Sequence, residues 1–172
     1  MMSALTRDAT ADDLPEIDRL FRASFTGTFA HLYSEQNLTT FLAKFTPETW
    51  AREFADPRFA FRIAELHGEP VGYLKLGPMD LPVAPERLEG AREIYQFYLL
   101  DSAKGSGIAD ELMNWAVDKG RALGGSELYL SVFIDNRRAR RFYERHGFEY
   151  VGPYHFMVGD QADEDIIMSR PL

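Results

Sequence analysis

A short glycine turn, Lys-Gly-Ser-Gly-Ile-Ala at residues 104–109, constrains the fold more than any other segment of this chain. It follows an apolar, strand-forming run at 91–100 and precedes a run in which apolar residues recur at helical spacing. Another strand-like run follows at 127–133, so we expect a strand–helix–strand crossover with one parallel pair of strands. Backbone N–H groups converge at such a helix start, where the helix dipole favours an anion. The turn therefore indicates a phosphate-bearing ligand, although the same glycines would also serve a plain tight turn.

Two common phosphate-binding patterns do not fit this turn. A Walker loop needs a lysine directly after its last glycine, and here Lys104 precedes the glycines. A dinucleotide fingerprint counted from Gly105 needs glycine or alanine where Asp110 stands. In addition, only 63 of the 172 residues follow Ala109, too few for the rest of a dinucleotide-binding domain. Both interpretations are therefore excluded.

Hydrophobic periodicity and turn residues predict the other elements. Thr10 is a candidate N-cap for a helix that continues to about Phe25, and Pro47 suits the first turn of a helix that ends near Phe54. The remaining expected elements are a strand at 3–9, a helix at 37–45, a hairpin of strands at 58–66 and 71–77, a loop at 78–90, a helix at 136–146, and two strands at 148–158 and 164–170 joined by an acidic turn. This order predicts a single domain, residues 1–172, of the α/β (α+β) class, with a mixed sheet flanked by helices.

Composition limits the classes of function. The net charge of -8 argues against a nucleic-acid surface, and it is compatible both with a cationic substrate and with plain solubility. The absence of cysteine excludes disulfides, thiolate metal sites and a cysteine nucleophile. The four histidines lack metal-ligand spacing, so we expect no metal. The first residues turn polar too early for a signal peptide and no stretch is long enough to span a membrane, so we expect a cytoplasmic protein.

Two segments resemble the motifs of the GCN5-related N-acetyltransferase (GNAT) family, and they occur in the expected order. Residues 97–109 resemble its acetyl-CoA motif, a strand followed by Arg/Gln-x-x-Gly-x-Gly/Ala. Lys104 stands at the Arg/Gln position, where its charge can still face a pyrophosphate without arginine's planar fork. Residues 136–148 match the second pattern, Asn-x-x-Ala-x-x-Phe-Tyr-x-x-x-Gly-Phe.

The resemblance implies the GNAT fold: a mixed, mostly antiparallel central sheet of about seven strands, splayed at one parallel pair and flanked by helices. It implies acetyl-CoA as co-substrate and transfer of the acetyl group to a primary amine. A weaker resemblance to PaiA-type polyamine N-acetyltransferases, at residues 24–29, 38–45 and 71–76, implies a polyamine such as spermidine as acceptor. Acetylation of peptide or ribosomal-protein N-termini and non-catalytic acyl-CoA binding stay open as alternatives. A homodimer is compatible with the sequence.

By this resemblance, pantetheine fills the gap where the strand ending at Leu99 leaves its parallel neighbour. Backbone groups of Phe97 and Leu99 would bind it, and the Leu99 N–H would polarise the thioester carbonyl. Asn136 would hydrogen-bond pantetheine and also cap the next helix, and Arg138 would meet a CoA phosphate. The full set implied in cofactor binding is Phe97, Tyr98, Leu99, Lys104, Gly105, Ser106, Gly107, Ile108, Ala109, Asn136, Arg138 and Tyr143.

Acetyl transfer by direct attack needs a neutral amine and a proton for the departing thiolate. An alkylamine has a pKa near 10, so about one molecule in a thousand is neutral at pH 7. The resemblance makes Glu93 the candidate base and Tyr143 the candidate acid; an ordinary strand-end carboxylate and a core aromatic are the alternatives. Without a cysteine nucleophile, we expect attack within a ternary complex. Residues that could line an acceptor site for a cation are Tyr33, Glu35, Tyr73 and Tyr95.

Overall fold

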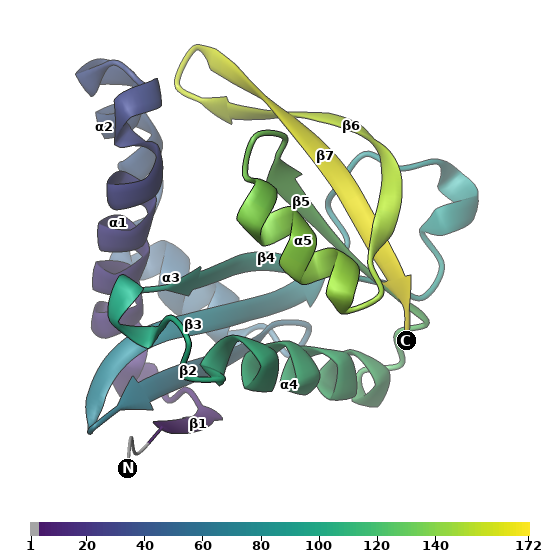
Figure 1. The fold of residues 1–172 in the computed structure, drawn as a ribbon, viewed down its shortest axis with the longest axis horizontal. Coiled ribbons are helices and arrows are strands. Elements are labelled where there is room, and N and C mark those ends of the chain that lie inside the picture. The colour runs from purple at the N-terminus through teal and green to yellow at the C-terminus, as the bar shows by residue number, and fades with distance from the viewer. Residues whose placement is uncertain (1–3) are drawn as a thin grey trace.

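The computed structural model describes residues 4–172, which form a seven-stranded sheet in the order β1-β2-β3-β4-β5-β7-β6 (Figure 1). Neighbouring strands pair antiparallel except β4 and β5, which are parallel. This confirms the mixed, mostly antiparallel sheet expected from the sequence. The strands are β1 (Ala4–Asp8), β2 (Ala60–Leu66), β3 (Glu69–Pro78), β4 (Ala91–Leu99), β5 (Glu127–Phe133), β6 (Glu149–Val158) and β7 (Gln161–Pro171).

Helices flank the sheet on both faces (Figure 1). One face carries α1 (Leu14–Phe29), α2 (Glu35–Leu42) and α3 (Pro47–Ala55), and the other carries α4 (Ile108–Ala122) and α5 (Arg137–Arg145). None of the helices within residues 4–172 combines the length and the apolar character that a membrane span requires. Short 3₁₀ segments lie at Ala11–Asp13, Ala30–Leu32, Pro85–Arg87 and Asp101–Ala103.

Each face of the sheet has its own apolar core. Ile108, Leu112 and Ala116 recur every four residues along α4 and are fully buried against the sheet. The opposite face is packed with aromatic rings, in which Phe21 on α1 lies 4.4 Å from Phe45, centroid to centroid. Burial of these two sets fixes α4 and α1 on opposite sides of β4, the strand that precedes the glycine turn.

Hydrogen bonds at helix starts set several element boundaries. The Thr46 hydroxyl accepts from the Thr49 N–H at 3.2 Å, so α3 begins at Pro47 as predicted. The Ser34 hydroxyl accepts from the Asn37 N–H at 3.1 Å, so α2 begins at Glu35, earlier than the predicted helix at 37–45. These N-caps are local interactions, so each one fixes the residue at which its helix begins.

Two expected boundaries were wrong because distant packing decides them. α1 continues past Phe25 to Phe29, whose ring packs 6.2 Å from that of Phe133 on β5, centroid to centroid. β7 begins at Gln161 rather than at 164, because β6 and β7 pair all the way to the turn, where Val158 lies opposite Gln161. Asp163 therefore lies within a strand and not in an acidic turn.

β4 and β5 separate along most of their length. They pair only between residues 91–93 and 127–129, after which β4 runs to Leu99 and β5 to Phe133 without pairing to each other. On its other side β4 bulges: Lys75 of β3 lies opposite Gln96 and Leu76 opposite Ile94, which leaves Tyr95 as the extra residue. A bulge increases local twist and bends a strand. The separation is the splay that the family resemblance implied.

Candidate active site

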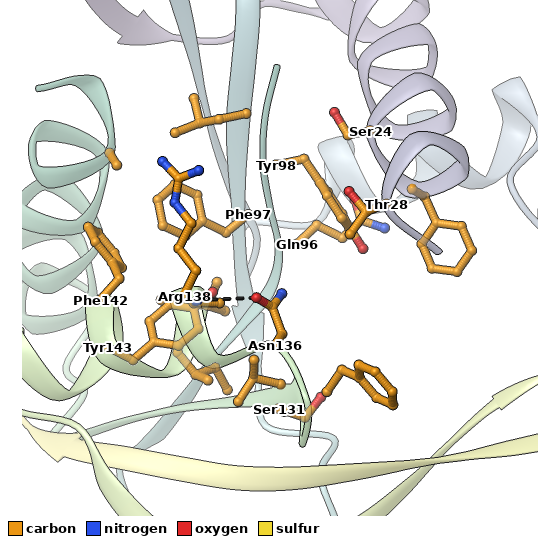
Figure 2. Close-up of a pocket in the computed structure, with 18 of the residues that line it drawn as sticks. Ser24, Thr28, Gln96, Phe97, Tyr98, Ser131, Asn136, Arg138, Phe142 and Tyr143 are labelled. Carbon is orange, nitrogen blue, oxygen red and sulfur yellow. Dashed lines mark hydrogen bonds between the residues drawn. The ribbon is translucent and has the colours of Figure 1, made fainter. Parts of the chain in front are cut away.

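A cavity of about 790 Å³ occupies the gap between the separated strands (Figure 2). Residues 94–99 of β4 and 130–133 of β5 line it. The glycine turn and α5 border the cavity on one face of the sheet, and α1 and β7 contribute residues on the other. Figure 2 shows Tyr143, Phe142 and Asn136 across the cavity from Ser24 and Thr28 of α1. Two ligands entering from opposite faces can therefore meet in this gap.

The glycine turn presents free backbone donors to the cavity. Gly105 and Gly107 line it with φ of 76° and 85°, conformations that favour glycine, and a Cβ at either position would meet no atom within 4 Å. Within residues 4–172, the N–H groups of Gly105, Gly107 and Ala109 have no hydrogen-bond partner. These donors stand at the N-terminus of the 15-residue helix α4, whose dipole favours an anion. The turn therefore fits the phosphate groups of CoA.

Cationic side chains surround this half of the cavity. Lys104, Arg138 and Arg145 line it. Lys104 forms an exposed ion pair with Asp101, which lowers the pKa of that carboxyl. Exposed pairs of this kind are weak, so Lys104 can exchange its partner for a phosphate.

Backbone groups of β4 point into the gap at alternate residues. The Leu100 N–H donates to the Val71 carbonyl of the strand on the other side at 2.8 Å. Because successive residues of a strand direct their N–H and C=O groups to opposite neighbours, Phe97 and Leu99 direct theirs toward the side that β5 has left. These are the backbone groups that the family resemblance assigned to pantetheine and to the thioester carbonyl.

Tyr143 is a core aromatic that also reaches the cavity. It is 9% exposed, and its ring packs 6.5 Å from Phe97 and 5.7 Å from Phe148. Burial raises its pKa, so the hydroxyl stays protonated at neutral pH. No group within residues 4–172 hydrogen-bonds to this hydroxyl, which lines the cavity and is free to donate to a ligand.

Asn136 serves two purposes at the start of α5. Its Oδ1 accepts from the Ala139 N–H at 3.2 Å, drawn as a dashed line in Figure 2, and this caps the helix. Its amide also lines the cavity. The cap fixes the side chain in place, so its N–H₂ group is held ready for a ligand.

Not every residue implied in cofactor binding lines the cavity. Ser106 and Ile108 do not: the Ser106 hydroxyl accepts from the Ile108 N–H at 3.3 Å, and the Ile108 side chain is buried in the core. Both residues shape the turn. Tyr98 does line the cavity, but its ring lies on the α1 face, 5.5 Å from Phe21.

Glu93 is buried close to the cavity but is not among the described residues that line it. Its carboxylate accepts from the N–H groups of Asp80 at 2.8 Å and Leu81 at 3.2 Å, which fixes the start of the 78–90 loop. Burial raises the pKa of Glu93 to about 7, and the Asp80 N–H opposes this shift. The role of Glu93 as a base stays a prediction.

The structure separates the four candidate acceptor residues. Tyr33 and Tyr95 line the cavity, and the Tyr95 hydroxyl donates to the Pro78 carbonyl at 2.6 Å. Tyr73 does not: it is fully buried and donates to Gln96 Oε1 at 2.7 Å. Glu35 lies exposed in the first turn of α2, away from the lining.

Two carboxylates that no sequence motif singles out also line the cavity. Asp163 and Asp165 alternate along β7, so their side chains share one face of the sheet. The Tyr33 hydroxyl donates to Asp163. Burial, with Asp163 as the second cause, raises the pKa of Asp165 to about 7. The available signal was an Asp-x-Asp alternation running into the apolar residues of a buried strand.

Comparison with known sequences gives a family. The sequence model of the Acetyltransferase (GNAT) family matches residues 14–148. An uncharacterized N-acetyltransferase in the pepI 3′ region of Lactobacillus delbrueckii subsp. lactis is 32% identical over 164 residues, 93% of this chain and 92% of that protein. An aminoalkylphosphonate N-acetyltransferase of Salmonella typhimurium is 30% identical over 100 residues, 58% of this chain and 63% of that protein.

Solved structures share the fold at lower sequence identity. The PaiA N-acetyltransferase of Thermoplasma acidophilum, in complex with coenzyme A, superposes with a TM-score of 0.75 at 21% identity and covers 99% of both chains. The ribosomal-protein-alanine N-acetyltransferase of Brucella melitensis gives a TM-score of 0.70 at 23% identity over 98% of this chain and 99% of that one. Fold, splayed strands and sequence agree: the chain belongs to the GNAT family of acetyltransferases and is an acyltransferase.

Proposed function

We propose that this enzyme transfers the acetyl group of acetyl-CoA to a primary amine by direct attack within a ternary complex. One observation carries the proposal: the cavity runs between two separated strands, with free N–H groups and cationic side chains on one side of the sheet and carboxylates on the other. Such a cavity suits two substrates of opposite charge.

The CoA half is built from the glycine turn, β4 and α5. The free N–H groups of the turn would hold the pyrophosphate, with Lys104 and Arg138 beside it. The backbone groups of Phe97 and Leu99 that point into the gap between β4 and β5, together with the Asn136 amide, would hold the pantetheine arm. When bound, acetyl-CoA supplies a thioester as the acyl donor.

Two groups of the chain act on the reacting atoms in this proposal. The Leu99 N–H donates to the thioester carbonyl oxygen, where negative charge develops. The Tyr143 hydroxyl donates its proton to the departing sulfur; a thiol pKa of about 8.5 means that the sulfur needs only modest help. Deprotonation of the amine falls to a carboxylate on the acceptor side, either Glu93 acting through water or a carboxylate of β7.

We propose a polyamine such as spermidine as the acceptor. The cationic lining residues come from the glycine turn and α5, and β7 contributes Asp163 and Asp165 on the acceptor side. An aminoalkylphosphonate, the acceptor named for the Salmonella relative, would bring its negatively charged phosphonate group toward these carboxylates. A polycation meets complementary charge instead. A cytoplasmic location and a homodimer stay predictions.

The test is a panel of amines incubated with acetyl-CoA, with release of free thiol as the readout. The protein contains no cysteine, so it adds no thiol background. We expect turnover with spermidine and other polyamines to exceed turnover with amino acids, aminoalkylphosphonates and peptide N-termini. Preference for an N-terminal peptide would favour the ribosomal-protein alternative, and CoA binding without turnover on any amine would favour a non-catalytic module.

A further inference from the structure

Asp165 is a buried carboxylate without a partner. It is 8% exposed and lines the cavity. Among residues 4–172, no donor hydrogen-bonds to its oxygens and no cation pairs with it. A buried carboxylate normally has donors around it, because an unpaired charge in the interior is costly. The missing partner therefore points to a group that enters the cavity from outside.

Asp163, two residues earlier on the same face of β7, has the opposite character. It is 7% exposed, and it accepts from the Tyr33 hydroxyl and from Gln161 Nε2 at 2.9 Å. These donors hold Asp163 in a fixed position as a carboxylate. It thus adds negative charge beside Asp165 while Asp165 itself stays free for a ligand.

A second unpartnered polar atom belongs to a residue of the same cavity lining. The Ser24 Oγ of α1 is buried, has no hydrogen-bond partner within residues 4–172, and belongs to the cavity lining. Figure 2 shows Ser24 and Thr28 on the α1 side of the cavity. Ser24 and Thr28 therefore add hydroxyl groups to the α1 wall of the same cavity.

The walls around these polar groups are aromatic. Phe29 and Phe133 meet edge to face with centroids 6.2 Å apart, and Tyr33 stacks on Phe25 at 5.9 Å. All four residues line the cavity, as does Phe156. Ring faces attract cations and also pack against methylene groups. An aliphatic chain with ammonium ends matches both properties.

We propose that Asp165 binds the ammonium group of an aliphatic di- or polyamine and removes its proton, with Asp163 holding a second positive charge of the same molecule. This inference deepens the proposed function and rests on it. Asp165 takes one proton from the nitrogen, whose lone pair then forms the C–N bond as the C–S bond breaks. Tyr143 gives its proton to the departing sulfur and recovers one from the nitrogen, and Asp165 releases its proton to solvent.

The surroundings of Asp165 support a base that works near neutral pH. Its pKa is raised to about 7 by burial and then by Asp163. The other titratable groups that feel the charge of this carboxylate are three tyrosines: Tyr33 in the connection after α1, Tyr98 on β4 and Tyr154 on β6. The pKa of each tyrosine is raised, so all three stay neutral near pH 7. Glu93 also couples to Tyr154, and its own pKa of about 7 requires a separate variant in any pH study.

The decisive experiment compares Asp165→Asn with Asp163→Asn and Glu93→Gln. Glu164→Gln is the matched control, because Glu164 is the exposed neighbour on the opposite face of β7 and its loss changes the charge equally. Rates with acetyl-CoA and spermidine are measured from pH 5 to 9, and spermidine binding to the CoA-loaded protein is measured by calorimetry. Butylamine serves as the matched monoamine.

We expect Asp165→Asn to lower kcat/KM for spermidine by about 100-fold and to abolish the rise in rate near pH 7, with the KM for acetyl-CoA unchanged. Asp163→Asn should raise the KM for spermidine about tenfold and leave the KM for butylamine unchanged, and Glu164→Gln should match the wild type. Partial recovery in Asp165→Glu would separate a base from a structural role.

Four outcomes decide both proposals. Turnover in which Asp165→Asn stays within twofold of the wild type, with the rise near pH 7 intact, overturns the role of Asp165 and leaves the acetyltransferase proposal standing. If only Glu93→Gln loses the rise in rate near pH 7, the base is Glu93, and the proposed role of Asp165 is overturned. Spermidine binding that depends on Asp165 without turnover overturns the function but keeps the site. Absence of both binding and turnover overturns both.

Discussion

Replacing Asp165 by Asn measures the free energy of burying one carboxylate, independently of any activity. Its pKa of about 7 in the folded protein compares with an ordinary value of 3.8. Each pKa unit corresponds to about 1.4 kcal/mol, so full ionisation of Asp165 costs the folded state about 4 kcal/mol. Asn has nearly the same shape and no charge, so the variant lacks this cost at every pH.

The sign of the effect follows from the raised pKa. A carboxyl that binds its proton more tightly in the folded state contributes fully to stability below about pH 4 and loses this contribution as the pH rises through about 7. Between pH 5 and pH 8.5 the wild type should therefore lose about 2–3 kcal/mol of unfolding free energy relative to Asp165→Asn. Glu93 titrates in both proteins, so its contribution cancels in the difference.

Urea denaturation of both proteins at five pH values between 5 and 8.5 gives this difference directly. Any constant cost of burying the Asn amide shifts the variant equally at all pH values, so the slope with pH is the readout. Glu164→Gln, a change of the exposed neighbour, is the matched control. A difference between wild type and Asp165→Asn that stays constant with pH would refute the reasoning, since the carboxylate would then be hydrated in the folded state.

Three further predictions concern other parts of the site and the core. Tyr143→Phe keeps the packing against Phe97 and removes the unpartnered hydroxyl, so kcat should fall about 100-fold in the thiol-release assay while CoA binding by calorimetry changes little. Gly107→Ala places a side chain at φ 85° in the glycine turn and should weaken CoA binding about tenfold, with Gly124→Ala, at φ 83° beyond the other end of α4, as the strain control. Trp50→Ala should lower the unfolding free energy by about 3–5 kcal/mol, since Trp50 is 3% exposed, and a loss below 1 kcal/mol in urea denaturation would contradict the described packing.

The half of the cavity that we propose for CoA was predictable because local sequence builds it. Left-handed glycines, an N-cap asparagine and a helix start are properties of a few adjacent residues, and the structure has each of them at Gly105, Gly107 and Asn136. Within this half, the sequence did not distinguish the residues that line the cavity from Ser106 and Ile108, which shape the turn. That distinction depends on which way a side chain points after packing.

The half that we propose for the acceptor was harder to predict because long-range contacts assemble it. Tyr33 meets Asp163 across 130 positions of sequence, and neither residue belongs to a local pattern that indicates the other. Tyr73 and Glu35 were predicted at this site because their residue types suit a cation. Packing instead places Tyr73 in the core and Glu35 on the surface.

The sequence by itself determined the family, the order of helices and strands, and the glycine turn at 104–109, because these depend on periodicity and on backbone conformations that only certain residues adopt. The tertiary structure alone decided which carboxylates face the cavity. The start of β7 is set by its pairing with β6. That pairing places Asp163 and Asp165 on the same side of the sheet as α1, where they are buried. The environment that raises the pKa of Asp165 forms only when elements distant in sequence exclude water around it.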